Sequence, residues 1–172
     1  AAGVRTAVVD WPLSNHMELL PARVKRPVYS SAKYEGSLTD GARLGKVADV
    51  YAADFAAHPD GEPMRLLMGY VHAVDSAGHK YGPEAPEVDQ AVRDTDEVLE
   101  TVIRRVKATF EAQARASDRL YVVISTDHGM STVKSMVDLK ELFGETLPKS
   151  AVTTTSGPLG NVYLVGVPEE ER

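Results

Sequence analysis

The chain has 172 residues, of which 43% are hydrophobic and 26% are charged, a composition typical of one globular domain with a buried core. It contains no cysteine, which excludes disulfides and thiolate metal sites, so any metal must be held by His, Asp or Glu. Nineteen basic residues against 25 acidic ones give a net charge of −6 without a basic block, which argues against binding to a nucleic-acid duplex.

Four short apolar runs predict strands, and helical patterns lie between them. The strands are expected at Val4–Val9, Leu66–Val71, Leu120–Ile124 and Val162–Val167. Apolar residues at steps of three, four or seven predict a long amphipathic helix from Pro86 to Phe110. Shorter helices are expected at Lys46–Ala57 and Val137–Phe143, and the proline- and serine-containing stretch Leu13–Asp40 is predicted to be irregular.

This alternation of strands and helices predicts an α/β sandwich around a mostly parallel sheet. In it, Leu66–Ile124 forms one βαβ unit with a right-handed crossover. Both strands of such a unit end at the same edge of the sheet, where ligands bind in folds of this class. Because both ends of the sequence lie next to strand-like runs, we expect the chain to be a piece of a larger protein.

An Asp/His pair follows each strand of this βαβ unit. Asp75 and His79 stand in a segment whose small residues, glycines and closing proline are typical of a loop, although one turn of helix would place both side chains on the same face. Asp127 and His128 follow the other strand, and Gly129 would allow a turn on which they converge. Either pair alone is more often a solvated hydrogen bond, so the residues by themselves leave a metal centre and ordinary turns equally open.

The segments YVHAVDSAGHKYGPEAPEV and VVISTDHGM resemble two motifs of the type I phosphodiesterase/nucleotide pyrophosphatase (autotaxin-like) family of the alkaline phosphatase superfamily. The segment DWPLSN is similar to the Trp-Pro-Gly-Ser region of that family, with Leu13 in place of the glycine. The resemblance runs from about Val4 to Val167. It implies an alkaline-phosphatase-like α/β/α sandwich, of which residues 1–172 are a partial catalytic domain.

Members of that family use two zinc ions to clamp the substrate phosphate. The resemblance assigns Asp75 and His79 to one ion, and Asp127 and His128 to the other. It also places Tyr70 in the substrate pocket, although an aromatic residue of the core or of the sheet end is a comparable interpretation. The threonine nucleophile of the family has no match in this chain. The hydroxyl residues are therefore interpreted as ordinary polar loop residues: Ser125, Thr126 and Thr153–Thr155.

The resemblance thus implies a zinc-dependent hydrolase of phosphodiester or pyrophosphate bonds, acting on nucleotide or phospholipid-type substrates. The catalytic domain would be incomplete here, and we expect this chain alone to be inactive. Two alternatives stay open: another hydrolase of the superfamily, such as a phosphonoacetate hydrolase or phosphomonoesterase, and a catalytically silent metal-binding or interaction module. The expected partner is a small-molecule phosphodiester or nucleotide. No apolar run is long enough for a transmembrane segment.

Overall fold

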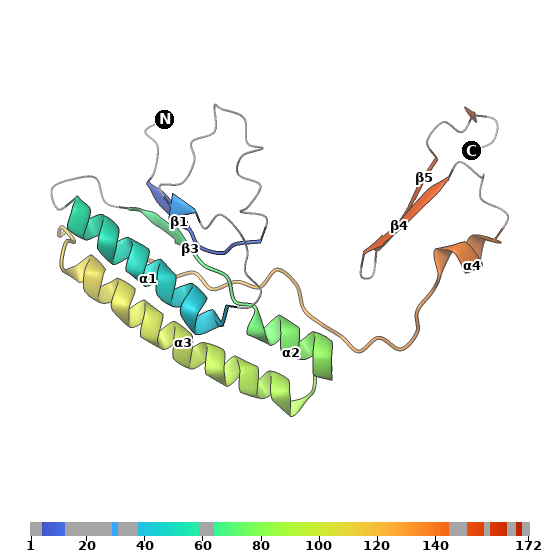
Figure 1. Cartoon of the computed structure of the whole chain (residues 1–172), viewed down its shortest axis with the longest axis horizontal. Helices are drawn as coiled ribbons and strands as arrows, with labels where there is room; N and C mark the ends of the chain where they lie inside the picture. Colours follow the sequence, from blue (N-terminus) through green and yellow to red (C-terminus); the bar gives the residue numbers. More distant parts are fainter. Residues whose placement is uncertain are drawn as a thin grey trace. The chain divides into compact units, whose positions relative to one another are not determined.

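The computed structural model describes residues 5–12, 29–30, 38–58, 64–144, 151–156, 159–164 and 168–169. These residues belong to two compact units, Ala1–Ser131 and Thr132–Arg172. Three helices and a small sheet make up the first unit, and a short helix with a hairpin makes up the second (Figure 1). None of the helices in the described ranges is both long and apolar enough to cross a membrane.

The sheet of the first unit is parallel. β1 (Thr6–Val8) lies between β2 (Tyr29–Ser30) and β3 (Leu66–Met68) and runs parallel to both. β1 and β3 form within the apolar runs predicted at Val4–Val9 and Leu66–Val71. The predicted α/β class with a parallel sheet is therefore confirmed.

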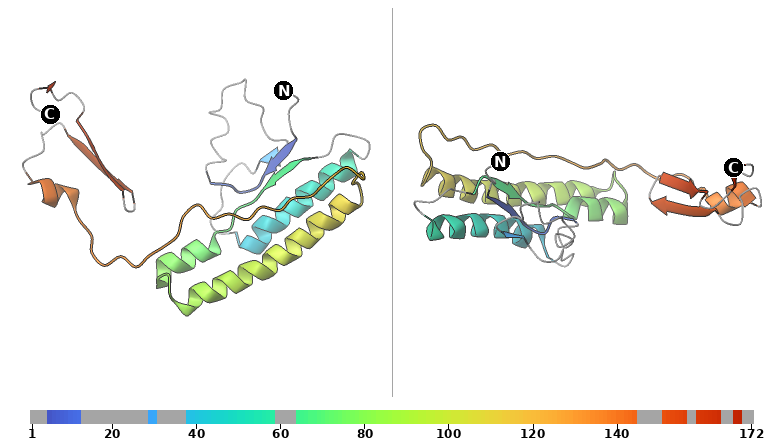
Figure 2. Two further views of the ribbon diagram at one scale, coloured as in Figure 1. Left: turned by 180° about the vertical axis from the view of Figure 1, so that it is seen from behind. Right: turned by 90° about the horizontal axis from the view of Figure 1, so that it is seen from above.

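Two long helices, α1 (Asp40–Ala57) and α3 (Pro86–Glu111), lie side by side and run in the same direction (Figures 1 and 2). The long helix was predicted from Pro86, which occupies the first turn as its fixed backbone angle favours. α1 begins at Asp40 rather than at the predicted Lys46. The reason is a local N-cap, since the Thr39 hydroxyl accepts a hydrogen bond from the Ala42 amide at 3.2 Å.

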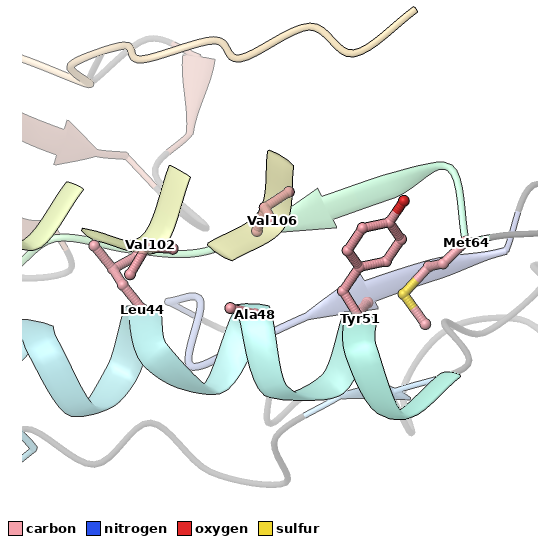
Figure 3. Packing of buried hydrophobic residues seen from close by; sticks show 7 residues of the cluster. Leu44, Ala48, Tyr51, Met64, Val102 and Val106 are labelled. Atoms are coloured by element: carbon pink, nitrogen blue, oxygen red, sulfur yellow. The ribbon is translucent and has the colours of Figure 1, made fainter. Parts of the chain in front are cut away.

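The core of this unit lies where α1, α3 and the sheet meet. Side chains of α1 point toward those of α3 and toward Met64, two residues before β3 (Figure 3). The labelled members are Leu44, Ala48 and Tyr51 of α1, Val102 and Val106 of α3, and Met64. Gly69, just after β3, lies so close to α1 that a Cβ there would be 2.7 Å from Leu44 Cδ2. The chain leaving β3 therefore packs directly on α1.

The predicted strand Leu120–Ile124 does not form. The segment after α3 is extended but pairs with no strand in the described ranges, and Tyr121 and Val123 are 82% and 86% exposed. Leu120 does pack against the core cluster. A strand of this apolar kind needs a hydrogen-bonded neighbour and cover on both faces, and a run of β-branched residues does not by itself provide either. The prediction of a βαβ unit over Leu66–Ile124 is therefore wrong.

The second unit consists of α4 (Leu139–Phe143) and an antiparallel pair, β4 (Val152–Ser156) and β5 (Leu159–Tyr163). α4 falls within the predicted helix Val137–Phe143, while β5 reaches only the first two residues of the predicted strand Val162–Val167. Residues 165–167 lie outside the described residues.

The threonine run Thr153–Thr155 lies in β4 and not in a loop, so that interpretation was wrong. β-branched threonine favours strands, and here β5 supplies the partner that a strand requires.

Candidate metal centre

Asp75 and His79 lie on a helix, not in the loop that their sequence suggests. α2 (Ala73–Tyr81) places them one turn apart, with Asp75 Oδ1 3.5 Å from His79 Nε2. The helix ends at Gly82, whose φ of 93° is easily adopted only by glycine and whose amide donates to the Gly78 carbonyl at 2.9 Å. The glycine and proline at the end of this segment thus terminate a helix and do not prevent one.

The N-terminus of α2 is held by a buried network of charged residues. Asp40 accepts hydrogen bonds from the amides of His72 and Ala73, both at 3.0 Å. Arg43 in turn donates from Nη1 to Asp40 at 2.6 Å and from Nε to Asp10, which follows β1. These three charged side chains are almost completely buried. None of the three was predicted as a site residue, although Asp10, directly after the predicted strand Val4–Val9, was a usable signal.

The second Asp/His pair lies in a turn-like segment after α3. The Thr126 hydroxyl donates to the His128 carbonyl at 2.6 Å, and the His128 amide donates to Asp127 Oδ1 at 3.1 Å. This conformation places His128 Nε2 3.6 Å from Asp127 Oδ2 and 4.0 Å from Asp75 Oδ1. The two pairs therefore meet, although the strand expected to bring them together does not form.

A close contact between Met130 and Gly78 accompanies this arrangement. A Cβ on Gly78 would lie 2.5 Å from Met130 Sδ and 3.1 Å from its Cε, so the thioether occupies the space left by the missing side chain. Gly78 is buried on α2. Met130, two residues after His128, thus packs against the helix that carries Asp75 and His79, and in this position only glycine at residue 78 leaves room for it.

The four side chains fit a zinc site in donor type. Two carboxylates and two imidazoles are ligands that zinc takes readily. Asp75 Oδ1 is buried and accepts no hydrogen bond from the described residues, although it lies near Nε2 of both His79 and His128. A buried carboxylate oxygen without a donor is unfavourable, and a cation at this position would relieve it.

The four side chains do not surround a common point at which an ion could lie. They form a chain of contacts, and within the described part of the molecule no three His, Asp or Glu side chains are arranged to hold an ion. The side chains of His79, His128 and Asp127 are 72%, 57% and 74% exposed, so they can rotate without unpacking the core. Their role as ligands stays a prediction.

Tyr70 stands between β3 and α2 and forms an aromatic group with Trp11. Their ring centroids are 6.2 Å apart with an interplanar angle of 66°, an edge-to-face arrangement, and the His72 ring is 6.3 Å from that of Tyr70. Trp11 is 39% exposed. Tyr70 is half-buried at the end of the sheet, three residues before Ala73, where the helix that carries Asp75 and His79 begins.

Comparisons with known proteins agree with the two motifs. The type I phosphodiesterase/nucleotide pyrophosphatase family matches residues 1–172. Human ectonucleotide pyrophosphatase/phosphodiesterase family member 7 is 38% identical over 81 residues, which are 46% of this chain and 17% of the human protein. A pyrophosphatase/phosphodiesterase of Schizosaccharomyces pombe is 28% identical over 130 residues, 74% of this chain and 23% of that protein.

Among solved structures, murine ectonucleotide pyrophosphatase/phosphodiesterase 5, an inactive variant in complex with AMP, is similar with a TM-score of 0.47 and 23% sequence identity. The similarity covers 63% of this chain and 26% of that chain.

Because the family match spans the whole chain, the chain belongs to the type I phosphodiesterase/nucleotide pyrophosphatase family, as the motifs predicted. The chain spans less than a quarter of the length of either relative described above. The comparisons favour neither a sister hydrolase of the superfamily nor a silent module.

Proposed function

We propose that this chain is part of the catalytic domain of a zinc-dependent hydrolase that cleaves phosphodiester or pyrophosphate bonds of nucleotides. Membership of the family supports the reaction class and the nucleotide substrate. The observation that carries the proposal is the meeting of the two Asp/His pairs, since carboxylate oxygens of both Asp75 and Asp127 lie within 4.0 Å of His128 Nε2.

In this proposal Asp75 and His79 hold one zinc ion, and Asp127 and His128 hold a second. When bound, the ions supply positive charge that stabilises the phosphoryl oxygens as the bond breaks. A catalytic zinc commonly has about three protein ligands and one open position. These four residues therefore fill two incomplete half-sites, and the remaining ligands would come from elsewhere in the complete protein.

The ring of Tyr70, with Trp11 beside it, is the proposed contact for the base or another apolar part of the substrate. Aromatic rings bind nucleobases by stacking, which tolerates different bases because each has a π-face. The partial exposure of Trp11 leaves part of its ring accessible to a ligand.

No hydroxyl of this chain is assigned as the nucleophile. Ser125 and Thr126 stand next to Asp127, but the hydrogen bonds of both hydroxyls run to backbone carbonyls, at 3.2 Å and 2.6 Å. A nucleophilic hydroxyl requires a base or a metal that removes its proton. We therefore expect this chain, loaded with zinc, to hydrolyse an activated phosphodiester far more slowly than a complete family member.

The test is to measure zinc stoichiometry and phosphodiester turnover for this chain and for the variants Asp75→Ala and Asp127→Ala. His58→Ala is the matched control, since His58 pairs with Asp54 at the end of α1 and not with the ligand group. We expect both aspartate substitutions to weaken zinc binding and the control to leave it unchanged.

Zinc binding that neither aspartate substitution alters would refute the metal centre. Robust turnover that is abolished in Asp127→Ala would instead show that the chain contains a nucleophile, with Thr126 and Ser125 the first residues to substitute.

A further inference from the structure

We propose that Arg43 is a positioning residue for the candidate metal centre. By holding the Asp40 carboxylate against the first amides of α2, it sets the orientation of the helix that carries Asp75 and His79. The inference rests on the proposed function, because it takes those two residues as metal ligands.

The first turn of α2 is capped from another helix. His72, which precedes the helix, makes no side-chain capping bond, and its ring contacts the Ser76 hydroxyl at 2.9 Å instead. The two carboxylate oxygens of Asp40 accept the amide hydrogen bonds of His72 and Ala73 separately. This satisfies two amides that have no partner within the helix, and places a negative charge at its positive end. The direction of α2 is thus tied to one side chain at the start of α1.

Arg43 fixes the direction of that carboxylate. Its guanidinium is 0% exposed and bonds with Asp40, with Asp10 and, from Nη2 at 3.2 Å, with the Leu38 carbonyl. Asp10 itself has a φ of 48°, a left-handed conformation that residues other than glycine seldom adopt. A planar guanidinium holds several oxygens in fixed directions at once, whereas the ammonium group of lysine is a single point charge.

The charge balance of this network includes the helix. Among the described residues, this buried network joins two carboxylates, those of Asp10 and Asp40, to the guanidinium of Arg43. A helix N-terminus is equivalent to roughly +0.5 of an elementary charge. The Asp40 carboxylate lies at the N-terminus of α2 and belongs to the first residue of α1. The positive ends of both helices therefore stabilise its negative charge. The buried charges and the position of α2 therefore depend on each other.

The ligands lie close to this attachment. Along a helix that rises by about 1.5 Å per residue, Asp75 is roughly 3 Å and His79 roughly 9 Å beyond Ala73. Any tilt or fraying of the first turn therefore moves both ligands together. It also changes the 4.0 Å separation between Asp75 Oδ1 and His128 Nε2 on which the meeting of the two pairs depends.

The variant that tests the inference is Arg43→Lys, which keeps the positive charge and removes the planar fork. We expect a roughly 10–100-fold loss of zinc affinity. This is the range found when residues that support and orient metal ligands are substituted. The visible absorption of the cobalt-loaded protein should change as well, because it reports ligand geometry. In the metal-free protein, the amides of His72 and Ala73 should exchange hydrogen faster than in the unsubstituted chain.

The matched control is Arg5→Lys. Arg5 forms a partly buried ion pair with Asp54, near the opposite end of α1, and has no contact with α2 among the described interactions. Both variants are compared at a temperature at which circular dichroism shows them folded, and the control should keep its zinc affinity. If Arg43→Lys does not fold, Asp10→Asn replaces it with the same readouts, since it removes one of the charges that hold the Arg43 guanidinium and leaves both oxygens of the Asp40 cap in place.

Unchanged amide exchange at His72 and Ala73 in Arg43→Lys would overturn the inference, whatever the metal does. Equal losses of zinc affinity in Arg43→Lys and Arg5→Lys would overturn it too, because they would indicate a general effect of stability. Failure of the proposed function is distinguished by Asp75→Ala. If that variant binds zinc like the unsubstituted chain, the proposed metal centre is refuted. Amide exchange at His72 and Ala73 then still decides whether Arg43 positions α2.

Discussion

Replacing Gly78 with alanine should affect the stability of α2 and the zinc affinity of the candidate metal centre in opposite directions. The added methyl group would lie 2.5 Å from Met130 Sδ. Non-bonded atoms of this kind are normally about 3.5–4.0 Å apart, so the thioether must move by about 1 Å. Because Met130 is two residues from His128, we expect this movement to draw His128 away from Asp75.

The two effects of this substitution have opposite signs. Alanine is favoured over glycine inside a helix by about 0.5–1 kcal/mol, so α2 should become more stable. The strain itself is small, because methionine has three rotatable bonds and can repack. The displaced histidine should lower zinc affinity by about tenfold, or ~1.4 kcal/mol. The expected variant is therefore at least as stable as the parent but binds zinc more weakly.

Urea unfolding and a zinc titration against a chromophoric chelator measure the two effects separately. Gly45→Ala is the matched control, because a Cβ at this position in α1 would have its nearest neighbour, Arg105 Nη1, at 3.9 Å. It should raise stability without changing zinc affinity. In the double variant Gly78→Ala/Met130→Ala the clash is absent, so zinc affinity should be no lower than in Met130→Ala alone.

The reasoning would be refuted if Gly78→Ala gained stability as Gly45→Ala does and still bound zinc with the affinity of the parent. That result would show that the Met130 contact does not determine where His128 lies. The 4.0 Å approach of His128 to Asp75 would then need another explanation.

Burial raises the pKa of Tyr51 and outweighs the Gln113 hydrogen bond, which lowers it. The resulting stabilisation is complete below the ordinary tyrosine pKa of about 10 and is lost as the pH rises through the folded-state value, so Tyr51→Phe should flatten the fall in unfolding free energy above pH 10. Leu44→Ala should lower the unfolding free energy by about 2–5 kcal/mol, because Leu44 is 6% exposed in the core; a loss under about 1 kcal/mol would contradict its central place there. AMP should quench the fluorescence of Trp11, the single tryptophan, and Tyr70→Ala should weaken that response, whereas unchanged emission would argue against nucleotide binding at these rings.

Elements whose signal is local were predictable from the sequence. α3 follows from a long amphipathic repeat that starts at a proline, and both are properties of consecutive residues. β1 and β3 also form inside their apolar runs. The identity of the candidate ligands was equally local, because the spacing of Asp75 and His79 and the adjacent Asp127 and His128 are visible in two short motifs.

Elements that depend on distant partners were not predictable. The run Leu120–Ile124 has a strand composition, but a strand exists only where a neighbour accepts its hydrogen bonds, and none does so within the described ranges. The segment around His79 has a loop composition, yet it is helical. Its first amides bond to Asp40, more than thirty positions earlier in the chain.

The chemistry of the candidate centre was thus fixed by residue types that the sequence displays, while its assembly was decided only by the tertiary structure. His128 Nε2 lies 4.0 Å from Asp75 Oδ1, and Met130, two residues further on, packs into the space beside Gly78. The first amides of α2 bond to Asp40, which Arg43 joins to Asp10 in the interior. Such pairings are set by how the chain is folded, and a buried charge is stable only where the fold brings its partner.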